Sequence, residues 1–181
     1  MTKIKLLAAT AIVALAVSPA FADPMVGGAA MSANKNIVQN ASKSKVHTTL
    51  VAAVKAGGLV KTLEGSGPFT VFAPTNKAFD ALPAGTVKNL LKPENKKEID
   101  KILTYNVVPG RYDTKTLDQD IKDGGGMADL KTVEGGTLTV SGSGKELMVT
   151  DAKGDTAKIT IPNVYQSNGV IMVTNKVLMP S

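Results

Sequence analysis

The chain has 181 residues, a formal net charge of +6 at pH 7, no Cys and one His. Without Cys it can form neither a disulfide nor a lipid-anchored cysteine, and a single His disfavours a zinc site. Its single Arg and 4% aromatic content disfavour a nucleic-acid partner, because base readout relies on Arg and stacking relies on aromatic rings. We therefore expect no metal, no cofactor and no nucleic acid.

The first 22 residues have the three parts of a secretory signal peptide. Lys3 and Lys5 give a basic start, an apolar run follows, and Ala20 and Ala22 are the small residues that precede a cleavage site. The sequence has no second apolar run long enough to span a membrane. We expect an exported protein, periplasmic or secreted, with no membrane span.

The mature chain divides into a short leader and one domain. Residues 23–35 are small, contain Gly and lack a period, which predicts a flexible leader. Residues 36–181 are enough for one domain with its own hydrophobic core. A monomer is expected, and its mild positive charge favours anionic surfaces such as polysaccharides.

Helical patterns fill most of the first half of this domain. Asn36 can cap a short helix, and His47, Leu50, Val51 and Val54 then follow the spacing of a core-facing helical stripe. This spacing places the lone His at the edge of the core, which favours a structural role for it over a ligand or base.

A strand at 69–72 is followed at once by a helix start. Pro74 cannot donate to a sheet, so strand pairing ends there. Thr75 or Asn76 can accept a hydrogen bond from the first N–H groups of the new helix, and Phe79 can pack that helix on the core. The corner lacks the Gly-x-Ser-x-Gly of an acyl-transfer elbow and the glycines of a phosphate loop, so it is predicted to be a structural joint.

A later helix carries Ile99, Ile102, Leu103 and then Asn106 on one face. The helix has to end before Pro109, because the helical conformation is disfavoured for the residue that precedes a proline. Because Asn106 continues this apolar stripe, its side chain is expected to face inward. A buried amide needs hydrogen bonds, so Asn106 is expected to tie the helix end to the strand–helix corner.

Short β-branched runs with turn residues between them fill the second half, as in "GGTLTVSG", "KELMVTD" and "AKITIPNV". The segment "DAKGD" and the pair Asn168-Gly169 predict hairpin turns. Since helices come first and strands last, with one early strand, the order argues for an α+β fold with an antiparallel sheet.

Three long motifs in series resemble the fasciclin domain family: "GPFTVFAPTNKAFDALP", "ILTYNVVPGRY" and "SNGVIMVTNKVLMP". The resemblance covers residues 36–180 in the family's order. It implies a fasciclin-like β-sandwich wedge with a cluster of α-helices at one side. It also implies a secreted or cell-surface module associated with adhesion, here resembling a single-domain bacterial protein.

The chain departs from this family at residues linked to its function. The central motif usually reads Tyr-His, but here it reads Tyr105-Asn106, and the closing motif often has His and Asp where Met172 and Asn175 stand. Expectations that depend on those histidines do not transfer to this chain.

The adhesion role of the central motif makes four residues candidates for partner binding: Tyr105, Asn106, Arg111 and Tyr112. The open alternative is that the first two are a buried structural tie. Other motif residues are assigned a structural role, namely Thr75, Asn76, Phe79, Pro109, Asn168 and Gly169.

We predict a non-catalytic interaction module that binds a cell-surface or extracellular protein or an anionic glycan. Lysines on the helical region could meet such a glycan: Lys88, Lys92, Lys96, Lys97 and Lys101. The alternative is a periplasmic small-molecule or glycan-binding protein with a pocket between helices and sheet. A hydrolase ranks last, because the sequence shows no nucleophile–base pair, metal set or paired-carboxylate signature.

Overall fold

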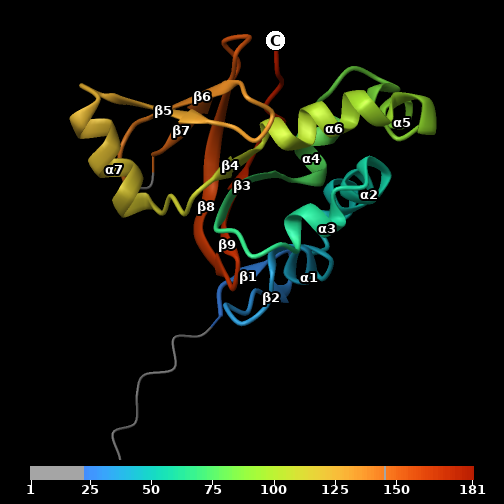
Figure 1. The fold of residues 1–181 in the computed structure, drawn as a ribbon, viewed down its shortest axis with the longest axis horizontal. Helices are drawn as coiled ribbons and strands as arrows, with labels where there is room; N and C mark the ends of the chain where they lie inside the picture. The colour runs from blue at the N-terminus through green and yellow to red at the C-terminus, as the bar shows by residue number, and fades with distance from the viewer. Residues whose placement is uncertain (1–22, 145) are drawn as a thin grey trace, which may run out of the picture.

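The computed structural model describes residues 23–144 and 146–181, and Figure 1 shows them as a sheet flanked by helices. Within these residues one large sheet has the strand order β4-β3-β9-β8-β7-β6-β5. In chain order its strands are β3 (Phe69–Pro74), β4 (Val107–Pro109), β5 (Met127–Lys131), β6 (Thr137–Ser141), β7 (Met148–Thr150), β8 (Thr156–Gln166) and β9 (Gly169–Thr174). The signal peptide predicted over residues 1–22 lies outside the described residues.

The sheet is mixed, which corrects the expectation of an antiparallel one. Strands β3 and β9 pair in parallel, from Phe69 beside Gly169 to Pro74 beside Thr174, and the other neighbours are antiparallel. All six residues of β9 are buried, as is typical of strands covered on both faces. Element order alone could not reveal this pairing, because it joins strands from opposite ends of the domain.

The sheet folds over on itself to give the expected wedge. Strand β8 is long and irregular, and it pairs with β7 through its first three residues and with β9 through the rest, from Ile159 to Gln166. The two edge strands β4 and β5 come into contact, and Val133 N donates to Val107 O at 2.8 Å beside them. The predicted α+β sandwich wedge is thus confirmed.

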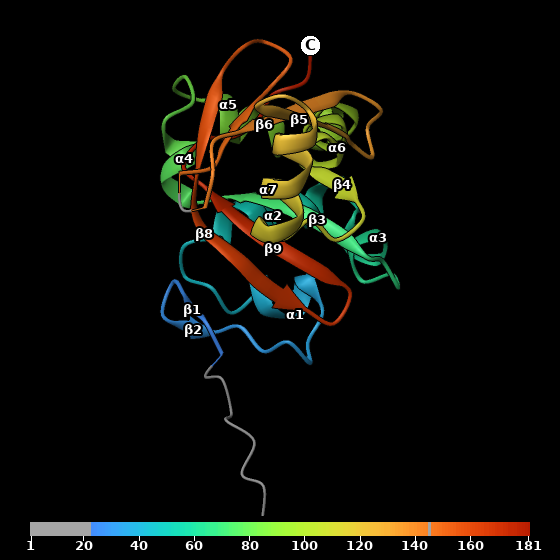
Figure 2. The same ribbon diagram turned by 90° about the vertical axis from the view of Figure 1, so that its left-hand side faces the viewer.

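Most helices cover one side of the sheet, as Figure 1 shows, and α7 lies apart at the other side, facing the viewer in Figure 2. One core cluster lies between the helices and the neighbouring strands β3 and β9. A second core cluster lies inside the folded sheet and under α7. In chain order the helices are α1 (Ile37–Ala41), α2 (Thr48–Gly57), α3 (Val60–Leu63), α4 (Asn76–Asp80), α5 (Thr86–Leu90), the 3-10 turn η1 (Pro93–Asn95), α6 (Lys96–Tyr105) and α7 (Thr114–Asp123).

The segment expected to be a flexible leader is instead packed on the domain. Strands β1 (Met25–Val26) and β2 (Ala29–Ala30) form a small hairpin, and Val26 and Met31 are 2% exposed. Gly27 has a φ of +60°, and a Cβ there would lie 2.5 Å from Ser44 Oγ, so the glycine permits the close approach. Two apolar side chains anchor a segment whose composition alone indicated flexibility.

The turns of the second half lie close to where they were expected. "DAKGD" joins β7 to β8. The β8–β9 turn consists of Ser167 and Asn168, one residue earlier than predicted, and Gly169 is the first residue of β9. A Cβ on Gly169 would lie 2.0 Å from Phe69 O, so this glycine serves the close approach of β3 rather than the turn.

Candidate functional site

Tyr105, the first residue of the central motif, is completely buried at the end of α6. Its hydroxyl donates to Thr137 O at 2.7 Å and accepts from Ala152 N at 2.8 Å. Its ring packs on Gly136, where a Cβ would lie 2.7 Å from the ring. Burial raises the pKa of Tyr105, and the Ala152 N–H bond offsets this in part. The side chain joins α6 to the folded sheet and presents no surface to a partner.

Asn106 faces inward, as its place on the helical stripe predicted, and is 3% exposed. Its Nδ2 donates to Ile102 O at 2.8 Å and to Leu178 O at 2.9 Å. The tie therefore runs to the C-terminal segment, and the expected tie to the strand–helix corner is wrong. The sequence could place the residue on a face but could not identify the segment that covers that face.

The strand–helix corner is a joint to a different helix. Thr75 precedes α4 without a side-chain cap, whereas Asn76 Oδ1 accepts from Thr49 N at 3.0 Å, in the first turn of α2. Asn76 Nδ2 donates to Lys45 O at 3.0 Å, and Phe79 is buried in the core. Asn76 thus caps α2, because the N-cap residue of that helix, His47, makes no side-chain capping bond.

Arg111 and Tyr112 reach the surface, whereas the two residues of the Tyr-Asn pair do not. Arg111 is exposed and its guanidinium contacts Gln166 O at 3.4 Å, and Tyr112 is half-buried. Thr70 Oγ1 holds their loop, because it accepts from Tyr112 N at 2.8 Å and donates to Gly110 O at 2.8 Å. Pro109 is exposed at the end of β4.

Tyr165 on β8 joins this surface and was missed by the sequence analysis. It is 39% exposed, and its hydroxyl donates to Asp113 Oδ2 at 3.1 Å. Burial and the adjacent Asp113 carboxylate raise the pKa of Tyr165, and Arg111 is close enough to act in the opposite sense. We call Arg111, Tyr112 and Tyr165 the tyrosine patch. Arg111 and Tyr165 are 54 positions apart in the chain, so no local motif could have joined them.

An open groove of about 440 Å³ extends from Tyr112 along α7 and β5. Met127, 57% exposed, lies in it. Three carboxylates also line it, those of Asp120, Asp123 and Asp129. The groove therefore combines apolar contact surface with negative charge.

His47 is buried, 3% exposed, with Nδ1 at 2.9 Å from Ser44 Oγ. Burial lowers its pKa, and the nearby Ala73 backbone offsets this in part. Within residues 23–144 and 146–181, no group of three His, Cys, Asp or Glu could hold a metal ion. The geometry favours the structural role expected from the sequence.

Acidification is expected to weaken the fold through His47. Because its pKa is lowered in the folded state, the unfolded chain binds the proton more readily below about pH 6.5. The free energy of unfolding should fall as pH drops from there towards the lowered pKa, by at most about 1.4 kcal/mol per pH unit. Denaturant titrations from pH 7.5 to 5 measure this. The His47→Gln variant should lack this fall in stability at low pH. Equal pH dependence in the variant and the wild type would contradict the prediction.

Comparisons with known proteins agree with this arrangement. The family model described as "Fasciclin domain" matches residues 45–180. "Protein sll1483" of Synechocystis sp. is 42% identical over 158 residues, which are 86% of this chain and 79% of that protein. "Cell surface glycolipoprotein MPB83" of Mycobacterium bovis is 33% identical over 159 residues, 85% of this chain and 64% of its own length.

The fold also matches a solved structure, a FAS1 domain pair from the insect cell adhesion molecule fasciclin I. The TM-score is 0.72 at 16% identity, over 80% of this chain and 51% of that one. Within the described residues no helix has the length and apolar character to cross a membrane.

Proposed function

Because the chain belongs to the fasciclin domain family, we propose that it is an exported, non-catalytic module that binds a cell-surface or extracellular protein. The family is associated with cell adhesion and surface proteins. A relative at 33% identity is named a cell surface glycolipoprotein, which supports a location outside the cytoplasm. The signal peptide expected over residues 1–22 supports export in the same way.

The observation that carries this proposal is the tyrosine patch with its adjoining groove. Tyr and Arg are enriched among the residues that dominate the energy of protein interfaces. Here Tyr112 lines an open groove together with an exposed Met, and Arg111 and Tyr165 lie next to Tyr112 through contacts with Gln166 O and with Asp113. Since three carboxylates line that groove, a neutral or basic protein surface fits it better than an anionic glycan does.

The test replaces the two tyrosines of the patch. Tyr112→Ala with Tyr165→Ala should weaken attachment to the producer's own envelope, or to neighbouring cells, by about tenfold or more. Attachment is measured with purified protein on a sensor surface, and a melting curve shows that the fold is retained. Met25→Ala is the matched control, because Met25 is 60% exposed and lies on the β1–β2 hairpin, outside the patch and the groove.

Two outcomes would reject the patch. Attachment that survives the double replacement would exclude it directly. Attachment that falls steeply with salt and is lost when Lys88 and Lys92 are replaced would indicate another partner. The chain would then bind an anionic glycan through Lys88 of α5 and Lys92, which precedes η1.

A further inference from the structure

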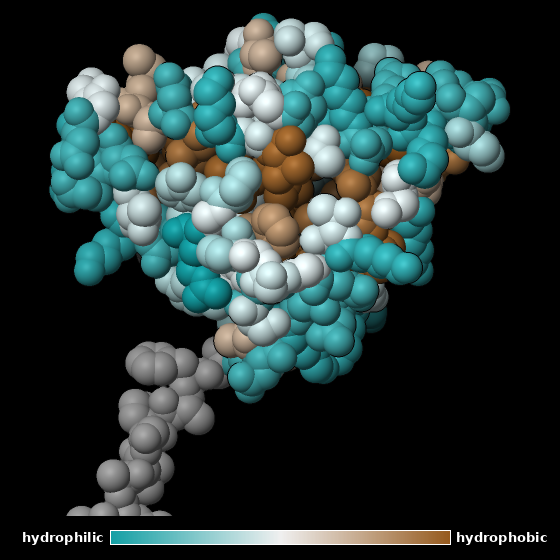
Figure 3. Space-filling view, viewed as in Figure 1, coloured by the Kyte–Doolittle hydropathy of each residue, from teal (hydrophilic) through white to brown (hydrophobic). Residues whose placement is uncertain are grey.

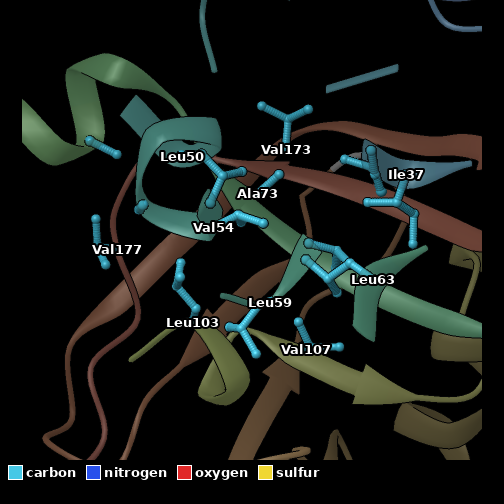
Figure 4. Packing of buried hydrophobic residues seen from close by; sticks show 14 of the residues in the cluster. Ile37, Leu50, Val54, Leu59, Leu63, Ala73, Leu103, Val107, Val173 and Val177 are labelled. Atoms are coloured by element: carbon cyan, nitrogen blue, oxygen red, sulfur yellow. The ribbon is translucent and has the colours of Figure 1, made fainter. Parts of the chain in front are cut away.

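The two sides of the sheet differ in how they are closed. On the helical side, buried side chains such as Leu50, Val54 and Leu103 pack in one cluster, which Figure 4 shows. On the other side α7 packs on the second cluster and leaves the groove of about 440 Å³ open beside β5. In Figure 3 apolar side chains lie among polar ones in the region where Figure 1 places α7 and β5. Tyr112 lines this groove, so the groove continues the tyrosine patch.

The groove runs along the free edge of β5. This strand is the last in the sheet order, and within residues 23–144 and 146–181 it pairs with β6 alone. The consecutive residues Met127–Leu130 line the groove, although their side chains alternate between an exposed and a buried face. Of the described part of the chain, β6 contributes no lining residue. A groove that touches residues of both faces of β5 and avoids β6 lies beside the backbone edge of the strand.

The backbone groups of Asp129 and Lys131 point to that edge. Along a strand, successive N–H groups point alternately to one neighbour and to the other. Thr132 N donates to Gly136 O at 3.0 Å, on the β6 side, whereas Val133 N points away from β6 and donates to β4 at 2.8 Å. Since Asp129 and Lys131 are in phase with Val133, their N–H and C=O groups also point away from β6.

The chain itself closes both ends of this free stretch. At one end Met127 O lies against the end of α7, because a Cβ on Gly124 would lie 2.0 Å from it. At the other end Val133 N is bonded to Val107 O. The open part of the edge fits an added strand of about three residues. A short, charged edge resists uncontrolled pairing, so it selects a short and complementary segment.

The charge of the groove determines which segment is complementary. The carboxylates of Asp120, Asp123 and Asp129 line it, and among the described residues no Lys or Arg does. The groove is thus a local negative region on a chain whose formal net charge is +6. Opposite charges on neighbouring strands stabilise their pairing and like charges destabilise it, which favours Lys or Arg in the added strand.

We propose that β5 binds an extended, basic segment of the partner protein, which adds to the sheet as a strand at this edge. The inference rests on the proposed function, in which a protein partner occupies the tyrosine patch and the groove. Hydrogen bonds to the backbone of Asp129 and Lys131 supply affinity, and basic side chains beside the three carboxylates supply specificity.

The probe is a capped pentapeptide of alternating lysine and valine, with lysine at both ends. On titration, the amide protons of Asp129 and Lys131 should shift and gain protection from hydrogen exchange, because they acquire acceptors. The amide protons of Ala128 and Leu130, which face β6, should change much less. The same peptide with glutamate in place of lysine should bind at least about tenfold more weakly.

Two N-methylated forms of the probe test the strand geometry without altering the protein. One is methylated on both valine nitrogens and the other on the nitrogens of its second and third lysines. Only alternate N–H groups of an added strand face β5, so one form should lose affinity by about tenfold or more while the other binds. A slip in register does not rescue the weaker form, because it turns the lysines to the other face.

Variants of the protein separate the backbone from the charge. Lys131→Pro removes an N–H that points to the edge and keeps the bonds to β6, so it should weaken the probe by about tenfold or more. Lys131→Ala keeps that N–H and removes a cation that repels the probe, so affinity should not fall. Asp120→Asn with Asp129→Asn should weaken the probe and flatten its salt dependence. A dispersed amide spectrum establishes that each variant is folded.

Three results overturn the inference: amide shifts that do not alternate along β5, equal affinity of the two methylated probes, or wild-type affinity in Lys131→Pro. A dimer mass with protection of β5 in the absence of probe would assign the edge to a second copy of the chain and reject it as well. The proposed function fails separately, if attachment survives the replacement of Tyr112 and Tyr165. Attachment that needs these tyrosines, without alternation at β5, rejects the added strand alone.

Discussion

Replacing Asn168 by alanine is expected to lower the free energy of unfolding by about 3–5 kcal/mol, because one buried amide serves three backbone groups. Its Oδ1 accepts from Ile37 N at 3.0 Å, at the start of α1. Its Nδ2 donates at 2.8 Å both to Leu63 O, at the end of α3, and to Gly65 O. The β8–β9 turn thus caps two helices from more than a hundred positions away.

The loss should be large because alanine leaves these groups without partners in a site that is 6% exposed. Denaturant unfolding at pH 7 provides the measurement. Asn175→Ala is the matched control: its Oδ1 also accepts one backbone bond, from Lys158 N at 2.8 Å, but it is exposed and water can replace it. The control should change stability by less than about 1 kcal/mol.

Asn168→Asp sharpens this test. It keeps the acceptor for Ile37 N but turns a carboxylate oxygen towards two carbonyls. The variant should therefore be least stable at neutral pH and should regain stability as acid protonates the carboxyl. An Asn168→Ala protein as stable as wild type would show that these three bonds contribute little.

Tyr105→Ala is expected to lower the free energy of unfolding by about 3–5 kcal/mol, because it removes a fully buried aromatic side chain. Tyr105→Phe should lower it by about 1–3 kcal/mol, because Thr137 O and Ala152 N would then lack their partner. Thermal or denaturant unfolding of both variants measures this. Tyr165→Ala, at a position 39% exposed, is the matched control and should change stability by less than about 1 kcal/mol.

This pair of tyrosines also separates the two roles considered for the central motif. If Tyr105 bound a partner, its phenylalanine variant would keep its stability and lose attachment. The burial of Tyr105 predicts the reverse, with attachment retained below the melting temperature. Unchanged stability together with lost attachment would return Tyr105 to the interaction surface.

Local sequence patterns were sufficient to predict the class of fold and the buried faces of its elements. Helical spacing identified Ile99, Ile102 and Leu103 as buried, and all three are. The Pro74 corner ended its strand where predicted, and three motifs in series indicated the fasciclin fold. These features depend on residues close together in the chain, whose periodicity and turn chemistry fix which side is covered.

Which segment covers each face could not be predicted from local patterns. Asn106 was expected inside, but its partner Leu178 is 72 positions away, and the amide of Asn168 reaches Ile37 across 131 positions. The parallel pairing of β3 with β9, the burial of Tyr105 and the bond from Tyr165 to Asp113 also join segments that are far apart in the chain. Periodicity records whether a side chain points towards the core, whereas its partner depends on chain segments that meet only when the sheet folds over on itself.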